Sequence, residues 1–271
     1  MQDSNNYAIQ TINLTKEFIS DRNLATLLLH PFQKRNTVLA VDGVNLQIRK
    51  GEIFGLVGVN GAGKTTLIKM LTTFILPTKG TAYINGYDIT KDGQKVKASI
   101  GLVTSEQNSF YYSLTGRQNL NFFASFHGLT FLETKKKIDE LASLLDIEEY
   151  LEIMFKEYSS GIRQRLSIAR SLLNNPDILL IDEPTKSLDF VNANNLRLFI
   201  KEELSRKLGK TIVFTTHNLQ EAEQLADRIA IMDKGKVKAS GAIQELCQKI
   251  GKPQARLEEI FTELIAKDVP A

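Results

Sequence analysis

The sequence predicts an α/β protein whose core is a mainly parallel sheet with helices on both faces. Two continuous apolar runs, at 53–57 and 178–182, are typical of strands that are buried on both sides. Strand-like and helix-like stretches alternate along much of the chain, as in doubly wound proteins. A glycine-rich loop, GVNGAGKTT at 58–66, follows the first apolar run directly. A loop of this kind between a strand and a helix is the third indication of this class.

Four strands are expected in the N-terminal part of the chain: 7–14, 44–48, 53–57 and 81–86. The first two alternate apolar and polar residues, as half-buried strands do. A helix is expected after the glycine loop, from about Lys64 to Phe74, stopping before Pro77. The last of the four strands is expected to end in the Asn85-Gly86 turn.

From about 115 to 175 the pattern is mostly helical, and the sequence predicts a helical insertion there. After the second buried strand, we expect an amphipathic helix at 191–207 and a strand at 211–215. A hairpin at 228–239 is expected to turn at Lys234-Gly235. The chain after Gly241 is expected to be helical. Its apolar residues fall on one helical face: Leu257, Ile260, Phe261 and Leu264.

The glycine loop matches the phosphate-binding pattern G-x-x-x-x-G-K-[ST] at Gly58, Gly63, Lys64 and Thr65. Glycines let backbone N–H groups converge on phosphate oxygens, and the N-terminus of the next helix adds partial positive charge. Lys64 is expected to reach the β- and γ-phosphates of ATP, and the Thr65 hydroxyl to bind Mg²⁺. A purely structural turn is the alternative, and Lys-Thr in this context argues against it. The expected ATP contacts in the loop are Gly58, Val59, Asn60, Gly61, Ala62, Gly63, Lys64, Thr65 and Thr66.

Two carboxylates, Asp182 and Glu183, end the second buried strand. Asp182 is expected to hold Mg²⁺ through its water shell, and Glu183 to polarise or deprotonate the attacking water. A pair of solvated acids at a strand end is the alternative. The phosphate loop upstream favours the functional interpretation.

Five further stretches make the chain resemble the ATP-binding cassette (ABC) family, the motor subunits of ABC transporters. They are Tyr158-Ser159-Ser160-Gly161-Ile162 (the signature motif), Ser187-Leu188-Asp189 (the D-loop), His217 (the switch histidine), Phe18 (the adenine-stacking aromatic) and Ser105-Glu106-Gln107 (the Q-loop). The resemblance covers about residues 7–240, and other phosphate-loop ATPases lack the signature motif. It implies a phosphate-loop, RecA-like core with an antiparallel β subdomain and an inserted helical subdomain.

The family mechanism implies that two cassettes sandwich two ATP molecules. The phosphate loop of one cassette then faces the signature motif of the other, so that Ser159, Ser160 and Gly161 contact the partner's nucleotide. Asp189 is implied to link the two sites, and Lys64, Glu183 and His217 to act in catalysis. Three rival interpretations remain: Phe18 as a core aromatic, Ser159 as a plain helix N-cap, and His217 as an ordinary histidine at a strand end.

The signature motif departs from the family pattern, with Ser160 in place of glycine and Ile162 in place of glutamine. The extra Cβ of Ser160 is expected to crowd the nucleotide slightly. The Q-loop is ambiguous by one residue. Counting forward from Ile100-Gly101 indicates Ser105, counting back from Leu114-Thr115 indicates Glu106, and chemistry indicates Gln107. We expect Gln107 to contact the metal, with Glu106 as the alternative.

The resemblance divides the chain into a cassette at 1–240 and a helical C-terminal tail at 241–271. Within the cassette it implies a helical subdomain at about 102–175. An insertion at about 19–39 carries leucines spaced mostly for one helical face. This insertion is expected either to form an amphipathic helix at a membrane or partner, or to be a loop that packs back on the cassette.

Composition limits the class of protein. The net charge is +3, from 34 basic and 31 acidic residues, so no nucleic-acid partner is expected. The single cysteine, Cys247, excludes an internal disulfide and a cysteine metal site. No apolar run approaches the ~18–20 residues of a membrane span, and the polar N-terminus lacks a secretory signal. We therefore expect a cytoplasmic protein that lies on the inner face of the membrane through a permease.

The resemblance extends to ABC-2 type exporters at three stretches: 40–44, 114–120 and 257–261. It implies ATP and Mg²⁺ as cofactors, a homodimer of cassettes, and a separate integral membrane permease. The expected cargo is a lipid, a lipid-linked glycan or a drug. An importer motor is the nearest alternative, and a soluble ABC ATPase acting on ribosomes or DNA is the rival from another class.

Overall fold

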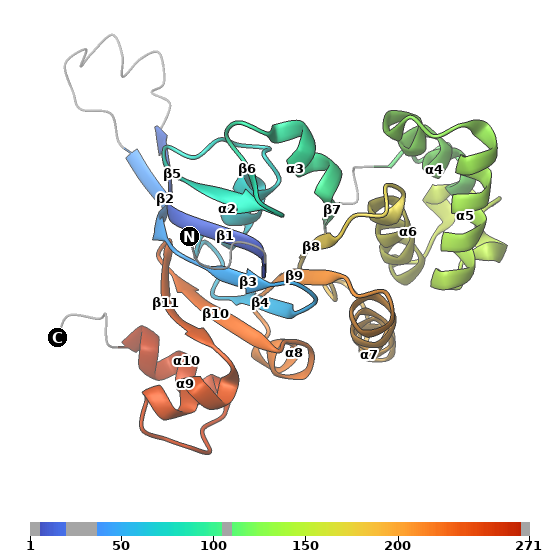
Figure 1. Cartoon of the computed structure of the whole chain (residues 1–271). Coiled ribbons are helices and arrows are strands. Elements are labelled where there is room, and N and C mark those ends of the chain that lie inside the picture. Colours follow the sequence, from blue (N-terminus) through green and yellow to red (C-terminus); the bar gives the residue numbers. More distant parts are fainter. Residues whose placement is uncertain (1–5, 20–36, 105–109, 267–271) are drawn as a thin grey trace, which may run out of the picture.

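The computed structural model of the chain describes residues 6–19, 37–104 and 110–266 (Figure 1). It contains two sheets. The strands are β1 Tyr7–Ile19, β2 Thr37–Val44, β3 Gln47–Arg49, β4 Ile53–Val57, β5 Lys79–Ile84, β6 Tyr87–Asp88, β7 Ile100–Val103, β8 Ile178–Asp182, β9 Thr211–Thr216, β10 Arg228–Asp233 and β11 Lys236–Gly241. The helices are α2 Lys64–Leu71, α3 Gly93–Ser99, α4 Gly116–Ala124, α5 Phe131–Leu145, α6 Ser160–Leu172, α7 Phe190–Phe199, α8 Leu219–Leu225, α9 Ile243–Lys249 and α10 Leu257–Ala266. Helix α7 continues as a π-helical stretch, Ile200–Lys207.

The larger sheet has the order β11-β10-β4-β9-β8-β7, and all its pairings are parallel except that of β10 with β11. Every residue of β4 and β9 is buried, because both faces of these strands are covered. The carboxyl ends of β4, β8 and β9 meet at one edge, where Val57 pairs with Thr216 and Asp182 with Thr215. The segments that follow these three strands therefore emerge side by side.

The smaller sheet is antiparallel, with the order β2-β1-β5-β6 and with β3 also paired to β1. Its apolar face and that of the larger sheet form one cluster that includes Ile9, Leu14 and Phe54. Leu67 and Met70 of α2 belong to the same cluster. Helix α2, which begins at the phosphate loop, is thus held between the two sheets (Figure 1).

Helices α4, α5 and α6 lie to one side of β7 and β8, away from the antiparallel sheet (Figure 1). We call them the helical lobe. Capping boxes start the first two helices, at Thr115 with Gln118 and at Thr130 with Glu133. The lobe thus corresponds to the mostly helical pattern at 115–175, and the fold is the α/β class with a mainly parallel sheet that the sequence predicts.

Several predicted elements have different bounds: the strand expected at 7–14 continues to Ile19, and that expected at 81–86 is found at Lys79–Ile84. The helix expected to reach Phe74 ends at Leu71, because Thr73 adopts a positive φ of 59° and the N–H of Phe74 bonds back to the Lys69 carbonyl. The strand expected at 44–48 is interrupted between β2 and β3. There the Asn45 side chain bonds the backbone N–H of Asn13, and so takes the place of a ladder bond.

Five elements were not predicted: β2 apart from Val44, and the short elements β6, α3, β7 and α8. The insertion expected at about 19–39 lies mostly outside the described residues; its described ends, Ile19 and Thr37–Leu39, belong to β1 and β2. The expected tail helices are present as α9 and α10, and Leu257 and Ile260 are buried. Within the described part of the chain, no helix is both long and apolar enough to cross a bilayer.

Candidate active site

The phosphate loop packs tightly against two neighbouring strands. A Cβ on Gly63 would overlap the carbonyl oxygen of Ala40 in β2, and one on Gly58 would overlap that of Met232 in β10. Gly63 also has a φ of +101°, which side-chain-bearing residues rarely adopt. Two of the three glycines are therefore needed for the shape of the loop itself, besides leaving its N–H groups open to phosphate.

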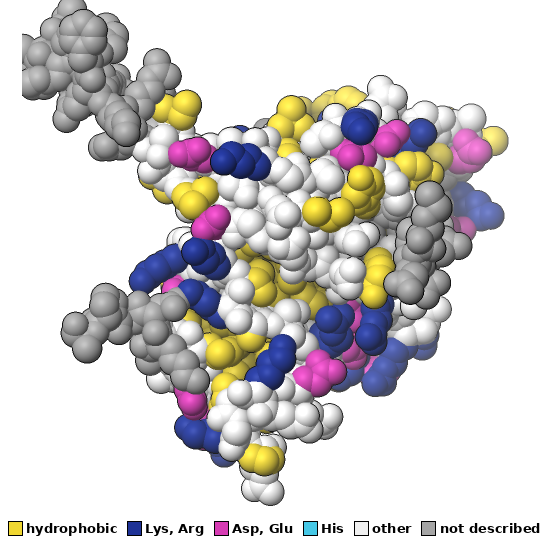
Figure 2. Space-filling view, turned by 60° about the vertical axis from the view of Figure 1, so that its left-hand side comes forward, with side chains coloured by type: hydrophobic (Ala, Val, Ile, Leu, Met, Phe, Trp, Pro, Cys, Tyr) yellow, Lys and Arg dark blue, Asp and Glu magenta, His cyan; other side chains and the backbone are white. Residues whose placement is uncertain are grey.

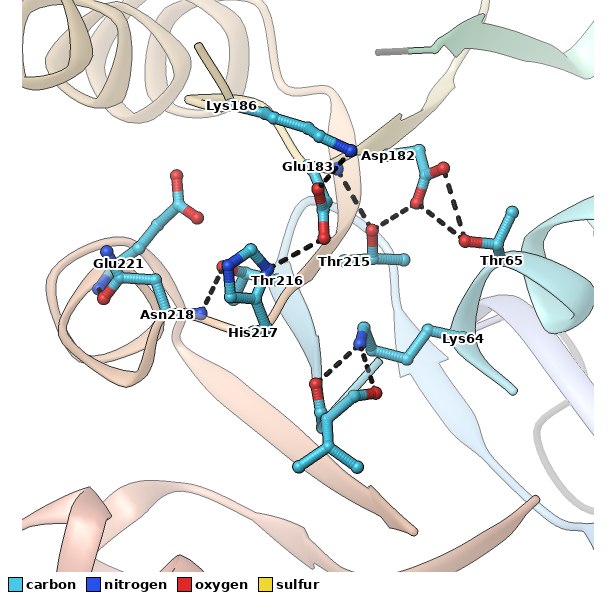
Figure 3. A network of polar contacts seen from close by, with 12 residues as sticks. Lys64, Thr65, Asp182, Glu183, Lys186, Thr215, Thr216, His217, Asn218 and Glu221 are labelled. Atoms are coloured by element: carbon cyan, nitrogen blue, oxygen red, sulfur yellow. Dashed lines mark hydrogen bonds and ion pairs between the residues drawn. The ribbon is translucent and has the colours of Figure 1, made fainter. Parts of the chain in front are cut away.

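Lys64 is buried at the start of α2, and its ammonium lies inside the curve of the loop. Its Nζ donates to the carbonyl oxygens of Gly58, at 2.6 Å, and Val59, at 3.0 Å (Figure 3). Burial lowers the pKa of Lys64, although the charges of Glu183 and Asp182 act in the opposite direction. The carbonyl bonds keep the ammonium desolvated and in place, so phosphate oxygens can replace them at small cost.

Asp182 and Thr65 face each other across the end of β8. The Thr65 Oγ1 lies 3.4 Å from both carboxylate oxygens of Asp182, and the Thr215 hydroxyl donates to the same carboxylate. A hydroxyl beside a carboxylate is the protein part of a Mg²⁺ site in phosphate-loop ATPases. Among the described residues, no group of three or more His, Cys, Asp and Glu could hold a metal. The pair therefore fits Mg²⁺ only together with phosphate oxygens and water.

A cavity of about 230 Å³ adjoins this pair. It is lined by Thr65, Ile68, Lys69, Phe74, Leu102, Thr104 and Asp182. Most of the lining outside Thr65 and Asp182 comes from the end of α2 and the segment after it, and from β7 and the residue that follows it. Thr65 and Asp182 are thus accessible from the side of the cavity that Leu102 and Thr104 line.

Glu183 is fixed from two directions. Its backbone has a positive φ of 51°, and its N–H donates to both the carbonyl and the hydroxyl of Thr215, each at 3.1 Å. Its carboxylate accepts a hydrogen bond from the His217 Nδ1 at 2.8 Å and forms an ion pair with Lys186 at 3.1 Å (Figure 3). Because a carboxylate accepts, the proton of His217 is on Nδ1 in this arrangement. The side chain of Glu183 is 15% exposed.

Burial by itself raises the pKa of Glu183, but the hydrogen bonds from His217 and Lys186 outweigh it and lower the pKa below its ordinary value. The carboxylate is therefore ionised at neutral pH. In this arrangement it can orient a water molecule and polarise it. It becomes a stronger base only when one of the two contacts is released.

The signature motif starts α6 and is exposed at both serines. Ser159 is the N-cap, and its side chain accepts a long bond of 3.4 Å from the Ile162 N–H. Within one chain the structure does not bring this motif to the phosphate loop, since α6 and α2 lie on opposite sides of β8 (Figure 1). Asp189 likewise caps α7, where it accepts bonds from the N–H of Asn192 at 2.9 Å and its side-chain amide at 2.5 Å.

Phe18 lies near the end of β1, next to the edge strand β2, and is 40% exposed. The Lys16 Nζ lies 5.2 Å from its ring centroid. An aromatic ring exposed to this degree is available for stacking and is not part of the core, which removes one rival interpretation. The three Q-loop candidates, Ser105, Glu106 and Gln107, lie outside the described residues.

Sequence reasoning missed three residues of the site. Thr215 bonds both Asp182 and the backbone of Glu183, Lys186 pairs with Glu183, and Glu221 accepts a 2.6 Å bond from Thr185. Thr215 lies two residues before His217, at the end of a predicted strand. Its role follows from the pairing of β9 with β8, and a single sequence does not give that register.

Comparison with known proteins finds a matching family and relatives that are named as ATP-binding proteins. The family described as "ABC transporter" matches residues 41–186. The chain is 37% identical to the ABC transporter ATP-binding protein NatA of Bacillus subtilis over 79% of this chain and 86% of that protein. It is also 37% identical to the methionine import ATP-binding protein MetN of Halalkalibacterium halodurans, over 86% and 69%.

The daunorubicin/doxorubicin resistance ATP-binding protein DrrA of Streptomyces peucetius is 37% identical over 82% of this chain and 66% of that protein. Among solved structures, a dimeric ATP-binding cassette in a post-hydrolysis state, bound to ADP and phosphate, superposes with a TM-score of 0.73. The two chains are 26% identical, and the superposed region covers 87% of this chain and 98% of the chain in that structure.

Proposed function

The chain belongs to the ABC transporter family, and from that premise we propose that it powers export through a separate membrane subunit. It is the ATP-binding motor of an ABC transporter, and it is an ATPase. The proposal of export rests on stretches such as 114–120, whose amino-acid sequence resembles that of ABC-2 exporters, and on the similarity to a drug-resistance protein. The proposed cargo is a drug, a lipid or a lipid-linked glycan.

The observation that best supports hydrolysis at this site is the convergence of five side chains at the carboxyl edge of β4, β8 and β9 (Figure 3). They are Lys64, Thr65, Asp182, Glu183 and His217. In the proposed reaction the phosphates of ATP lie at the N-terminus of α2, and Lys64 turns from the loop carbonyls to the β- and γ-phosphates. Thr65 and Asp182 hold Mg²⁺, which supplies positive charge to the phosphate oxygens when bound.

Glu183 then orients the attacking water on the far side of the γ-phosphate. As the water oxygen bonds to the γ-phosphorus, its proton passes to the carboxylate, and the bond from that phosphorus to the bridging oxygen breaks, so that ADP leaves. His217 keeps that carboxylate in place through Nδ1 and is free to contact the γ-phosphate through Nε2. In this way two neighbouring strand ends, β8 and β9, provide the acceptor for the proton and the group that positions it.

The proposed active form is a homodimer in which each ATP lies between the phosphate loop of one subunit and the signature motif of the other. Ser159, Ser160 and Gly161 contact the γ-phosphate from the N-terminus of α6, and Asp189 links the two sites. The exposure of both serines and the dimeric state of a similar cassette support this arrangement. Both halves of a site are encoded in one chain, which supports two identical subunits.

The proposed permease contacts the helical lobe near residues 108–119, which places the protein on the inner face of the membrane. Exposed aromatic side chains support this contact: Tyr111, Tyr112, Phe122 and Phe126. On the face in Figure 2, basic and acidic side chains are interspersed. The described residues on this face form no continuous basic stripe of the kind seen in proteins that bind nucleic acid.

The first test is a mild-detergent purification of tagged Glu183→Gln protein from membranes with ATP and Mg²⁺, followed by identification of its partners. We expect one polytopic subunit to co-purify, and Lys64→Ala protein to serve as the control that cannot bind ATP tightly. Ribosomal proteins in place of a polytopic subunit would contradict the proposal.

The direction of transport needs a second measurement, because MetN is as similar as DrrA. The complex is reconstituted in vesicles with the cassettes outside. An exporter accumulates its cargo inside these vesicles when ATP is added outside. An importer gives no such accumulation, and that result would favour the alternative.

A further inference from the structure

The first described residues after 109 form a strip with alternating orientation, Phe110–Tyr112. Phe110 is 6% exposed and stacks on Phe155, with ring centroids 4.7 Å apart. Tyr112 meets the edge of the same ring at 5.5 Å. Tyr111 points the other way, is 50% exposed, and packs against Phe122 of α4. The strip therefore packs through Phe110 and Tyr112 against the segment before the signature motif, while Tyr111 faces solvent and Tyr112 remains 40% exposed beside it.

Two arginines of the signature helix hold Phe110 and Tyr112 of this strip. The Arg170 guanidinium lies 4.7 Å from the ring centroid of Phe110, and that of Arg163 lies 5.7 Å from Tyr112 and 5.2 Å from Phe155. Residues seven apart lie on one face of a helix, two turns from each other. Cations over aromatic faces attract, more strongly where water is excluded. Burial lowers the pKa of Arg170 to about 10, so it remains a cation at neutral pH.

The backbone adds a second connection between the same two segments. The N–H of Lys156 donates to the Tyr112 carbonyl, and that of Phe155 to the Leu114 carbonyl, at 3.3 and 2.9 Å. Two bonds run in the opposite direction, from the N–H of Gly116 to the Ile153 carbonyl and from that of Arg117 to the Leu151 carbonyl, around an isolated antiparallel bridge between Thr115 and Met154. The segment 151–156 leads directly to Ser159.

Arg163 closes the connection, because its guanidinium also donates to the Lys156 carbonyl at 3.1 Å. The Tyr158 ring lies against Gly116, where a Cβ would overlap the hydroxyl oxygen of Tyr158. No gap is thus left at this point between residues 112–117 and the segment that precedes the signature motif.

We propose that Arg163 and Arg170 are positioning residues that clamp the strip 110–112 to the signature helix, so that a displacement of the outward-facing Tyr111 by the membrane partner moves Ser159. We call these contacts the arginine clamp. That the movement passes from the membrane partner to Ser159 rests on the proposed function, whereas the clamp itself rests on the contacts above. Through it, the partner's position sets how well Ser159 meets the second subunit's nucleotide.

The first experiment measures amide hydrogen exchange in the full-length protein without nucleotide. In Arg163→Met, exchange is expected to rise together in peptides covering 112–117 and 151–163, by about tenfold. Arg165→Met is the matched control, since Arg165 lies in the same helix but bonds Leu145 and Asp146. We expect the control to leave the 112–117 peptide unchanged. A change confined to one of the two segments, or equal in the control, would overturn the clamp.

The second experiment measures the dissociation constant of the ATP-bound dimer in a Glu183→Gln background. Arg163→Met and Tyr112→Leu are each expected to weaken the dimer about tenfold, and the double variant by less than the product of the two losses, because both variants remove the contact between Arg163 and Tyr112. Tyr112→Phe, which keeps the ring, is expected to behave as the parent. ATP affinity of the monomer is expected to stay unchanged, because the clamp does not touch the phosphate loop.

Additive losses, or an unaltered dimer in both single variants, would contradict the positioning role. If the Glu183→Gln parent itself forms no dimer with ATP, the proposed sandwich is wrong, while the exchange experiment still decides whether the clamp exists. If Arg163→Met does not fold, Tyr112→Leu provides the same test from the other side of the contact.

Discussion

Glu183 occupies a backbone conformation that a residue with a side chain avoids, and this strain of about 1–3 kcal/mol is repaid by its neighbours. The two bonds from its N–H to Thr215 fix the turn, and the carboxylate is then held by His217 and Lys186. The geometry for attack is thus present before the nucleotide arrives. A change of side chain at 183 leaves this backbone in place.

Glu183→Gln is therefore expected to fold and bind ATP as the parent does but to lose turnover by at least about a hundredfold, because an amide cannot accept the proton. Steady-state phosphate release and equilibrium ATP binding check the two parts. Hydrolysis at the parent's rate would show that another group activates the water.

His217→Ala is expected to raise the pKa of Glu183, since it removes a hydrogen bond that lowers it. A carboxyl whose pKa is lowered by folding stabilises the fold above its unfolded pKa, near 4.5, and loses that contribution as pH falls through the folded pKa. In His217→Ala the folded pKa lies closer to 4.5, so the contribution is expected to be smaller and its loss to be complete at a higher pH. Urea unfolding between about pH 3 and 6 measures it. Glu183→Gln is the control, because it has no carboxyl to titrate at this position. If the parent and His217→Ala show the same pH dependence of stability, His217 does not lower the pKa of Glu183.

At the residue scale, the sequence predicts Lys64, Asp182 and Glu183 because an ordered motif follows a recognisable strand. It does not predict Thr215 or Lys186, because their contacts depend on how two strands and a turn are placed in space. Phe18 is an intermediate case: the motif identifies the residue, while only its exposure distinguishes a stacking ring from a core ring.

The start of α2 shows how one element depends on another. Gly63 is the N-cap of the helix and has a positive φ. It lies against the Ala40 carbonyl of β2, so the phosphate loop packs on an edge strand of the antiparallel sheet. The β2 strand thereby connects the loop to Phe18, with which it pairs through Val38.

Gly63→Ala is expected to lower the free energy of unfolding by about 3 kcal/mol, from the positive φ and the overlap with Ala40 together. Gly61→Ala is the matched control: Gly61 also has a positive φ, of 82°, but an added Cβ meets nothing within 4 Å. It is expected to cost about 1 kcal/mol, from φ alone. Equal losses in the two variants, measured by chemical denaturation, would show that the packing against β2 has no effect.

At the element scale, the buried strands are predictable because β4 and β8 are continuous apolar runs, and α2 because a motif marks its first turn. The shorter elements are not. Helix α8 spans only Leu219–Leu225 and β7 only Ile100–Val103, so neither contains enough residues for a periodic pattern. Tertiary contacts with β4 and β8 determine them instead.

For the molecule as a whole, the separation of phosphate loop and signature motif within one chain means that a complete site needs two chains. Ser160→Gly is expected to tighten the ATP-bound dimer of the Glu183→Gln protein about threefold, because it removes a Cβ from the nucleotide contact. Sedimentation equilibrium measures the constant. Ser159→Ala is the contrasting variant, expected to weaken the dimer about tenfold by loss of a hydrogen bond to phosphate. A weaker dimer in Ser160→Gly would show that the serine hydroxyl contributes binding.

The place of β4 in the sheet determines when the protein can first work. β4 ends at Val57, yet its neighbours β9 and β10 begin only at Thr211 and Arg228. At about 5–20 residues per second, a ribosome needs on the order of ten seconds to synthesise the intervening chain. During that interval, an apolar strand destined for full burial is without both partners, and the loop after it has no β10 to rest on. The phosphate loop can therefore reach its packed shape only after Arg228–Asp233 has been synthesised.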